Sequence, residues 1–253
     1  MNKNMTAKQW LKKAQDEGFA IGAFNVGNLE TFKAVAEAAK NKRSPVIIES
    51  SPGETDWMGA DNIVDIARNY EWDFGIPILV NLDHALELEE CRKAIEEGYD
   101  LIHFDGSKLP VEQNLIILKQ VVEAAHAKGL TVEGELDHIG GSSEVHQESA
   151  QAVALEIKKT DPEKARDFVT QSGIDIFAAF VGNVHGLYSG GEKYLDIELL
   201  KKIATATDAF LSLHGSSGIA EDQIKAAIAN GVVKVNLNTE IRQAYKDSLE
   251  QVL

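Results

Sequence analysis

The chain has 253 residues, of which 44% are hydrophobic and 26% charged, and its 25 basic and 40 acidic residues give a formal net charge of −15. This apolar fraction supports a buried core and excludes an intrinsically disordered chain, and the negative charge argues against nucleic acid and membrane as partners, because both repel an acidic surface. A single cysteine, a first segment without the apolar core of a signal peptide, and the lack of any run of about 18 apolar residues lead us to expect a cytoplasmic protein.

Short apolar runs rich in β-branched residues alternate with amphipathic segments along the chain. Such runs are typical of parallel strands that are covered on both faces. In chain order, strands are predicted at 19–25, 44–50, 76–82, 100–105, 130–136, 173–182, 208–214 and 232–238. Helices are predicted at 6–17, before the first strand, and then at 28–42, 60–71, 86–97, 111–128, 161–171, 196–206, 220–230 and 239–252.

Eight strand–helix units are what a (β/α)8 TIM barrel requires, so we predict one α/β barrel domain over residues 1–253. An open, doubly wound sheet is the alternative, but it would normally carry a G-x-G-x-x-G turn after an early strand, and the chain has none. The longest connection, at about 137–160, contains the run Gly-Gly-Ser-Ser from Gly140. Long ordered connections are usually functional, and we expect this one to cover the barrel mouth as an active-site loop.

Polar residues follow nearly every predicted strand, and in a barrel the carboxyl ends of the strands form the active site. Three histidines from separate strands, His84, His185 and His214, would meet there. Three imidazoles can provide three corners of a tetrahedral Zn²⁺ site and leave the fourth open for catalysis. The competing interpretation is that each is a hydrogen-bonded residue of the rim. That interpretation is the one expected for the other four histidines, His103, His126, His138 and His146.

Two loops are candidates for binding a phosphate. The segment from His214 to Gly218 reads HGSSG, and the segment from Asn236 to Thr239 leads the last strand into the last helix. Phosphate sites in barrels often use the loops after strands seven and eight. Glycines let the backbone approach the anion, and amide N–H groups with a helix N-terminus supply positive potential. Such a site needs no lysine or arginine, which suits a chain of this charge.

Nine motifs between Gly18 and about Arg242 follow one another as they do in one enzyme family. They are GAFNVGNLET (22–31), SPVIIESSPGE (44–54), LDH (82–84), FDGSKLPVEQN (104–114), VEGEL with IGG (132–141), TDPEKARDFV (160–169), GNVHGLY (182–188), LHGSSGI (213–219) and KVNLNTE (234–240). On these motifs the chain resembles the class II, metal-dependent ketose-bisphosphate aldolases, which cleave fructose or tagatose bisphosphates. The fold of that family is a (β/α)8 barrel, in agreement with the strand count.

The resemblance implies a Zn²⁺ or another divalent metal held by His84, His185 and His214, with Asp105 and Glu135 near an alternative metal position. It leaves open a monovalent cation as a second cofactor. It also leads us to expect a homo-oligomer, either a dimer or a tetramer.

The resemblance assigns further roles to residues at the barrel mouth. Asp83 matches the catalytic acid/base, and Asn236 matches the residue that contacts the enediolate. The substrate and phosphate positions match at Asn25, Ser51, Gly186, Gly215, Ser217, Asn238 and Thr239.

The chain departs from the family pattern at several positions. The catalytic-loop glutamate falls at Ser143, so Glu144, one position later, is the expected catalytic substitute. The lysine that commonly follows HG-x-Y is Ser189, with Lys193 nearby as a replacement. The other departures are Asn81 and Ala85 beside LDH, Ser216 for a glycine, and Asn238 for an aspartate. Family members often carry a further C-terminal segment with an arginine for the second phosphate, so we expect altered recognition of the distal phosphate.

The resemblance implies an aldolase of carbohydrate metabolism, as in glycolysis, that reversibly joins dihydroxyacetone phosphate, or a close relative, to an aldehyde. A metal chelating the ketone and hydroxyl oxygens would stabilise the enediolate that C–C cleavage leaves. The Schiff-base route of class I aldolases needs a desolvated lysine inside the barrel, and none is predicted there. Two alternatives stay open: a related metal-dependent lyase or isomerase on another keto sugar phosphate, and a non-catalytic sugar-phosphate sensor.

Overall fold

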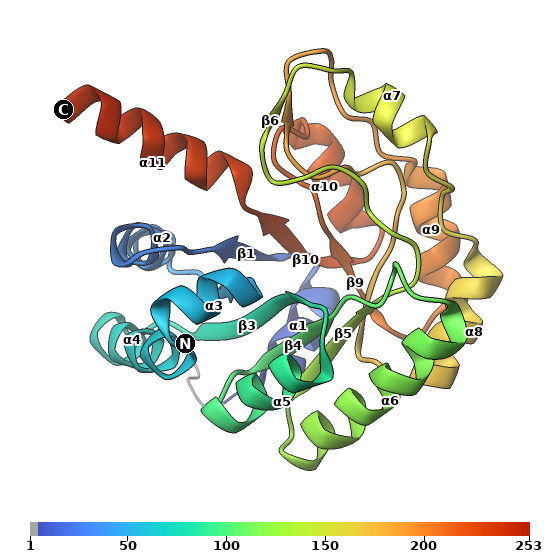
Figure 1. The fold of residues 1–253 in the computed structure, drawn as a ribbon, viewed down its shortest axis with the longest axis horizontal. Helices are drawn as coiled ribbons and strands as arrows, with labels where there is room; N and C mark the ends of the chain where they lie inside the picture. Colours follow the sequence, from blue (N-terminus) through green and yellow to red (C-terminus); the bar gives the residue numbers. More distant parts are fainter. Residues whose placement is uncertain (1–4) are drawn as a thin grey trace.

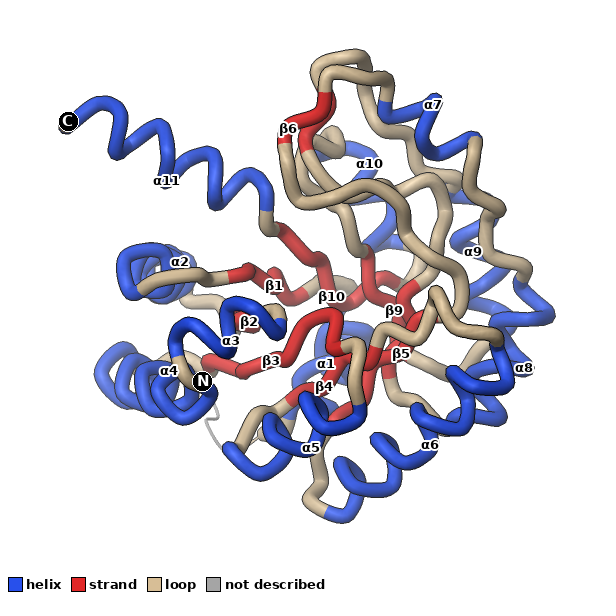
Figure 2. The backbone as a smooth tube through the Cα atoms, viewed as in Figure 1, coloured by secondary structure: helices blue, strands red, loops and turns tan. Residues whose placement is uncertain are grey.

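Eight parallel strands close into a barrel that helices surround (Figures 1 and 2). The computed structural model describes residues 5–253. The barrel strands are β1 (Ile21–Asn25), β2 (Val46–Ser50), β3 (Ile78–Ala85), β4 (Leu101–Phe104), β5 (Thr131–Glu135), β7 (Ile176–Ala178), β9 (Phe210–Leu213) and β10 (Val232–Leu237). They pair in the order β1-β10-β9-β7-β5-β4-β3-β2, and β2 pairs again with β1. All eight predicted strands are present, and the predicted (β/α)8 barrel is confirmed.

The predicted helices are also present, with ends that differ by three residues at most. The structure contains α1 (Ala7–Glu17), α2 (Leu29–Lys42), α3 (Pro52–Met58), α4 (Ala60–Phe74), α5 (Leu88–Glu97), α6 (Val111–Ala127), α7 (Ala150–Leu155), α8 (Pro162–Ser172), α9 (Ile197–Ala206), α10 (Glu221–Ala229) and α11 (Thr239–Val252). Helix α3 was not predicted, because it is too short to show an apolar period. A capping box stabilises the N-terminus of α3: the side chains of Ser51 and Glu54 each accept a hydrogen bond from the other residue's backbone N–H.

Two very short strands, β6 (Val145–His146) and β8 (Leu187–Tyr188), also escaped prediction. They pair in parallel and join the connection at 137–160 to the loop that carries His185. The ring of His146 stacks on that of Tyr188, with centroids 4.6 Å apart. The long connection is therefore attached to the carboxyl end of the barrel, beside α7 in Figure 1.

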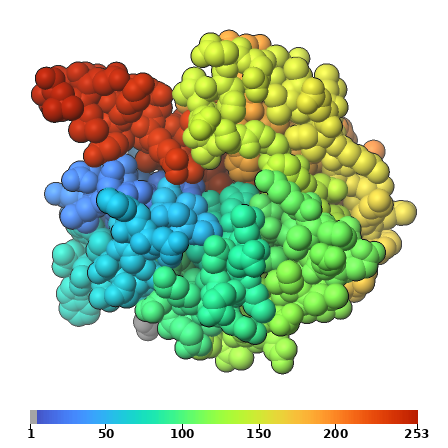
Figure 3. All heavy atoms as spheres, in the orientation of Figure 1, coloured from blue at the N-terminus to red at the C-terminus, as the bar shows by residue number. Residues whose placement is uncertain are grey.

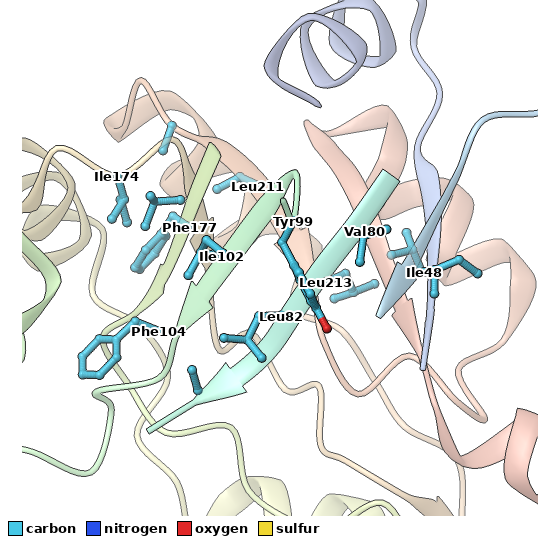
Figure 4. Packing of buried hydrophobic residues seen from close by; sticks show 14 of the residues in the cluster. Ile48, Val80, Leu82, Tyr99, Ile102, Phe104, Ile174, Phe177, Leu211 and Leu213 are labelled. Carbon is cyan, nitrogen blue, oxygen red and sulfur yellow. The ribbon is translucent and has the colours of Figure 1, made fainter. Parts of the chain in front are cut away.

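The largest apolar cluster lies between the strands and the surrounding helices. Figure 4 shows part of it, with Ile48, Val80 and Ile102 from three neighbouring strands. Tyr99 is buried in the same layer, and its hydroxyl group lies 2.9 Å from the Ser50 hydroxyl. This layer fixes the outer face of the barrel and leaves the inner face for other side chains.

Inside the barrel, the inward side chains of β3 change from apolar to polar toward the carboxyl end of the strand. On β3, Leu79, Asn81 and Asp83 share the inner face, because strand side chains alternate. Trp10 and Leu11 of α1 pack into the cluster that contains Leu79 and so close the amino end of the barrel. The polar groups are therefore collected toward the carboxyl end, where active sites of this fold lie.

Helix α11 leaves the barrel after β10 and projects beyond the neighbouring helices (Figures 1 and 3). Within residues 5–253, no helix combines the length and the apolar character that crossing a membrane requires.

Candidate functional site

A polar cavity of about 230 Å³ opens at the carboxyl ends of the barrel strands. Its walls are formed by Asn25, Ser51, Asp83, His84, Ser143, His185, Gly186, His214, Gly215, Ser216, Ser217, Asn236, Asn238, Thr239 and Arg242. Most of these residues were predicted as site residues, whereas Ser143, Ser216 and Arg242 were not. A larger groove of about 450 Å³ lies between α2 and α11, but its walls are mainly apolar and it contains none of the predicted site residues.

A bulge near the end of β3 lets two consecutive residues face the cavity. Alternation along a strand would turn Asp83 and His84 to opposite faces. The pairing of β3 with β4 shifts between Leu82 and Ala85, and His84 adopts a left-handed φ of 51°, which is unusual for a residue other than glycine. Strained backbone of this kind is concentrated at functional sites. Here it brings a carboxylate and an imidazole to the same wall.

Two of the histidines are each oriented by a carboxylate. Asp105 lies 2.9 Å from His84 Nδ1, and Glu133 lies 2.8 Å from His214 Nε2. A carboxylate that accepts a hydrogen bond from one ring nitrogen fixes the ring and leaves the other nitrogen free as a ligand. The two remaining nitrogens, His84 Nε2 and His214 Nδ1, lie 3.1 Å apart.

This spacing fits one tetrahedral metal ion. With Zn–N bonds of about 2.0–2.1 Å, two nitrogen ligands should lie roughly 3.4 Å apart and their ring centroids roughly 5 Å apart. The centroids of His84 and His214 are 4.8 Å apart. The ring centroid of His185 lies 5.2 Å from that of His84 and 6.1 Å from that of His214. The three predicted rings therefore gather at one wall of the cavity, and the donor atoms that already lie within 4.8 Å of one another belong to His84 and His214, with Asp83 and His103.

The histidines differ in charge in the absence of a metal. Burial and the neighbouring imidazoles hold the pKa of His185 well below its usual range, so its ring is neutral. Burial opposes the charged form of His84, but Asp83, Asp105 and Glu135 more than offset it and raise the pKa of that imidazole to about 10. A proton on His84 therefore competes with a metal for the site.

Asp105 and Glu135 form a second group with His84 on the side away from His214. Glu135 Oε2 is buried and has no hydrogen-bond partner within residues 5–253. Burial and the nearby Asp105 raise the pKa of Glu135 well above its usual range. Its other oxygen, Oε1, accepts the N–H of Ile139 at 3.0 Å, so Oε2 is the atom that suits a metal ligand at the predicted alternative position.

His103 was predicted to be a rim residue, and that prediction is wrong. Its side chain is fully buried on β4, and Nδ1 accepts the backbone N–H of His84 at 3.3 Å and lies 3.5 Å from Asp83 Oδ1. The residue lies inside the barrel because it shares the inward register of β4 with Leu101, which belongs to the inner apolar cluster. The alternation of inward positions on this strand could have revealed it.

Below the cavity, a buried lysine bridges two carboxylates. Lys234 Nζ lies 2.7 Å from Glu49 and 2.8 Å from Glu133, and also bonds Asn236 Oδ1 at 3.1 Å. No desolvated lysine was predicted inside the barrel, but Lys234 is one. Burial alone would lower its pKa, whereas Glu133 and Glu49 raise it above its usual range. The amine is therefore kept charged and is unsuited to the nucleophilic role of a Schiff-base lysine.

Asp83 has the surroundings of a carboxylate that is held ionised. Asn25 Nδ2 donates to its Oδ2 at 3.0 Å. Burial alone would raise the pKa of Asp83, but His84 and His103 more than offset burial and hold the pKa well below its usual range. The carboxyl group of Asp83 is therefore ionised where it lines the cavity.

Two predicted phosphate-binding glycines lie where neighbouring segments approach too closely for a side chain: Gly215 against the loop at 184–185, and Gly186 against Ser142 and His146 of the long connection. Gly186 and Gly215 have φ values of 96° and 61°. A Cβ on Gly215 would lie 2.5 Å from the carbonyl oxygen of Val184. The backbone N–H groups of Ser216 and Ser217 find no acceptor among residues 5–253 and are free to bind an anion.

The long connection contributes Ser143 to the cavity, where Asn238 Nδ2 donates to its hydroxyl group at 3.3 Å. Glu144, predicted to replace the catalytic-loop glutamate, has an exposed side chain and does not line the cavity. Its catalytic role stays a prediction.

Comparisons with known proteins agree with this geometry. Residues 5–253 match the family described as fructose-bisphosphate aldolase class-II. The chain is 40% identical over 248 residues to a fructose-bisphosphate aldolase of Streptococcus pneumoniae serotype 4, covering 96% of this chain and 82% of that protein. It is 37% identical over 246 residues to the D-tagatose-1,6-bisphosphate aldolase subunit GatY of Klebsiella oxytoca, covering 97% of this chain and 85% of that protein.

Solved structures of aldolases are also similar to this chain. The YdjI aldolase from Escherichia coli K12 superposes with a TM-score of 0.83 at 30% identity, covering 96% of this chain and 85% of that chain. A putative fructose-1,6-bisphosphate aldolase from Coccidioides immitis superposes with a TM-score of 0.85 at 30% identity, covering 98% of this chain and 86% of that chain.

The geometry predicts that the purified protein binds about one divalent ion per chain. His185→Ala should lower the affinity for that ion at least roughly tenfold, because it removes a nitrogen donor from the group. Elemental analysis after dialysis measures the metal content. His126→Ala is the matched control, since His126 bonds Asp175 and lies outside the cavity. An unchanged metal content in His185→Ala would contradict the three-histidine site.

Metal binding should also release protons. Because His84 is protonated in the metal-free protein, at least about one proton must leave when the ion binds. Affinity should therefore rise with pH, by roughly tenfold per unit for each proton released, between about pH 6 and 9. Calorimetry in buffers with different ionisation enthalpies counts the released protons. An affinity that does not change over this range would show that His84 is already neutral.

Proposed function

This chain belongs to the class II fructose-bisphosphate aldolase family, and we propose that it cleaves a ketose 1,6-bisphosphate to dihydroxyacetone phosphate and an aldehyde phosphate, and catalyses the reverse. The chain is an aldolase, and the proposal concerns its substrate and the roles of its residues. The observation that carries it is that the Asp83 carboxylate faces the same cavity as the converging imidazoles of His84, His185 and His214.

The nitrogen-rich donor set favours Zn²⁺ as the ion held by His84, His185 and His214. When bound, the ion would supply Lewis-acid stabilisation of the negative charge that develops beside the ketone during C–C cleavage. Asp105 and Glu133 orient the imidazoles toward this position.

In our proposal, Asp83 moves the proton. In the cleavage direction, one of its carboxylate oxygens accepts the proton of the hydroxyl group on the aldehyde side of the breaking bond, and in synthesis it returns that proton. Asn25 orients the carboxylate through the bond to Oδ2. Asp83 is ionised at neutral pH, as a base requires, and its depressed pKa makes it a weaker base than a free aspartate.

The cavity offers two sets of groups that suit a phosphate. The free N–H groups of Ser216 and Ser217 and the start of α11 at Thr239 suit the phosphate of the ketone half. Arg242 and Ser51 also line the cavity, and the guanidinium of Arg242 pairs with Glu54 at 2.7 Å. We assign the distal phosphate to Arg242, although the sequence patterns led us to expect altered recognition there.

Three further expectations stay predictions: residues 1–253 form a single domain, the protein is a homo-oligomer, and it is cytoplasmic. None of them is needed for the chemistry proposed for Asp83.

Asp83→Ala should retain the metal but lower the rate of C–C cleavage by roughly 10²–10⁴-fold, because the base is lost. Cleavage of fructose and tagatose 1,6-bisphosphates is measured by coupled assay, and exchange of the α-proton of dihydroxyacetone phosphate is measured by NMR. Asp56→Ala is the control, since Asp56 is exposed on α3. The aldolase mechanism would be wrong if the metal-loaded wild type neither cleaved these sugars nor exchanged this proton.

Arg242→Ala should lower kcat/KM for the bisphosphate by roughly 10- to 100-fold, the loss expected for a charged hydrogen bond, while proton exchange of dihydroxyacetone phosphate stays unchanged. The same assays measure both quantities. Lys246→Ala, with a more exposed cation one turn further along α11, is the matched control. Equal losses in cleavage and exchange would place Arg242 elsewhere than at the distal phosphate.

A further inference from the structure

Lys193 is a buried lysine whose ammonium group is surrounded by backbone carbonyls. It lies between β8 and α9, and only 2% of the residue is exposed. Its Nζ lies 2.6 Å from the carbonyl oxygens of Val184 and Gly186, 2.8 Å from that of Gly215 and 2.5 Å from that of Ser217. Within residues 5–253 it forms no ion pair with a carboxylate.

Four carbonyl oxygens around one positive charge resemble the shell that replaces the hydration of a bound alkali cation. The ammonium group has three hydrogens for four oxygens, so its charge contributes as well as its hydrogen bonds. Burial lowers the pKa of Lys193 to about 7, and the negative charge of the nearby Glu240 acts in the opposite direction. The ring of Tyr188, with its centroid 5.5 Å from Nζ, adds a weaker attraction.

The backbone of Lys193 is fixed by α10. Gln223 Nε2 donates to the carbonyl oxygen of Lys193 at 2.8 Å, and Gln223 Oε1 accepts the N–H of Leu195 at 2.8 Å. The ammonium group is therefore held at a defined point between the loop after β7 and the loop after β9. These are the two loops whose glycines line the cavity.

The ammonium group lies behind the anion-binding face of the loop after β9. In a trans peptide, the C=O and N–H groups point in opposite directions. Because the carbonyl of Gly215 points at Lys193, the N–H of Ser216 in the same peptide points away from it. A buried cation is costly, and an anion on the other face of the loop would offset that cost in addition to the attraction of Glu240.

We propose that Lys193 is an internal cation that takes the place of a monovalent metal ion: it holds the loops at 184–186 and 215–217 together and supplies positive charge to the substrate's phosphate. Binding of the phosphorylated substrate is then independent of K⁺ or Na⁺ in solution. The inference rests on the proposed function only for its ligand, a phosphate monoester. It makes Lys193 a positioning residue, since Lys193 does not line the cavity.

The test measures binding of inorganic phosphate by calorimetry, with potassium chloride or tetramethylammonium chloride at equal ionic strength. Wild-type affinity should be the same in both salts. Lys193→Ala should bind phosphate roughly 10- to 100-fold more weakly in tetramethylammonium, as expected for loss of a charged partner. K⁺ or NH₄⁺ should enter the vacated carbonyl shell and restore most of the affinity. The midpoint of thermal unfolding of Lys193→Ala should likewise rise with K⁺ concentration.

Lys193→Met is the matched control, because the methionine side chain fills the space of the lysine stem without the charge. In tetramethylammonium, Lys193→Met should bind phosphate as weakly as Lys193→Ala does. K⁺ should not restore the phosphate affinity of Lys193→Met. In turnover, Lys193→Ala should raise KM for the bisphosphate far more than it lowers kcat. If Lys193→Ala does not fold, Lys193→Gln replaces it, with the same expected loss of phosphate affinity.

Three results would overturn the proposal: a wild type whose phosphate affinity requires K⁺, a folded Ala or Gln variant with wild-type phosphate affinity, or a loss in Lys193→Ala that neither K⁺ nor NH₄⁺ restores. Phosphate binding is measured without turnover. Suppose that phosphate binding depends on Lys193 as predicted, but that the protein cleaves no ketose bisphosphate. That outcome would support the role of Lys193 and refute the proposed function.

Discussion

The candidate site depends on two hydrogen bonds between carboxylates and imidazoles, Asp105 with His84 and Glu133 with His214. Each leaves the opposite ring nitrogen free, and the two free nitrogens face each other at 3.1 Å. Without these bonds the rings could rotate, and the site would lose its preorganised donors. The bulge in β3 matters for the same reason, because it turns His84 toward the cavity that Asp83 also lines.

One of the two carboxylates that orient the histidines, Glu133, is itself balanced by a buried cation. Lys234 pairs with both Glu49 and Glu133, so Glu133 can stay ionised far from water. Burial and the attraction of Lys234 act in opposite directions on the Glu133 carboxyl, and the attraction of Lys234 and the imidazoles keeps its pKa well below the usual range. The interior thus carries its own charge balance, independent of the acidic surface.

The same principle applies at the phosphate loops, where positive charge is supplied locally. The backbone N–H groups of Ser216 and Ser217 have no acceptor among residues 5–253, and the ammonium group of Lys193 contacts the carbonyl oxygens of Gly215 and Ser217 in the same loop. A protein with a net charge of −15 repels an anionic substrate at long range, so the attraction must come from groups within a few ångströms. The barrel provides such groups at its carboxyl end, while α1 seals the amino end with Trp10 and Leu11.

The sequence by itself determined the barrel, because eight apolar strand patterns alternate with helical ones, and local hydrogen bonding and side-chain periodicity dictate both. It also identified His84, His185 and His214 and the glycine loops, since each follows a strand and the carboxyl ends of parallel strands must meet. Only the tertiary structure decided the roles of His103, Lys234 and Lys193. Their partners, such as Asp83, Glu133 and Gly215, are distant in sequence. Burial, charge pairing and the direction of a carbonyl depend on how the strands close on one another, and no local pattern records that.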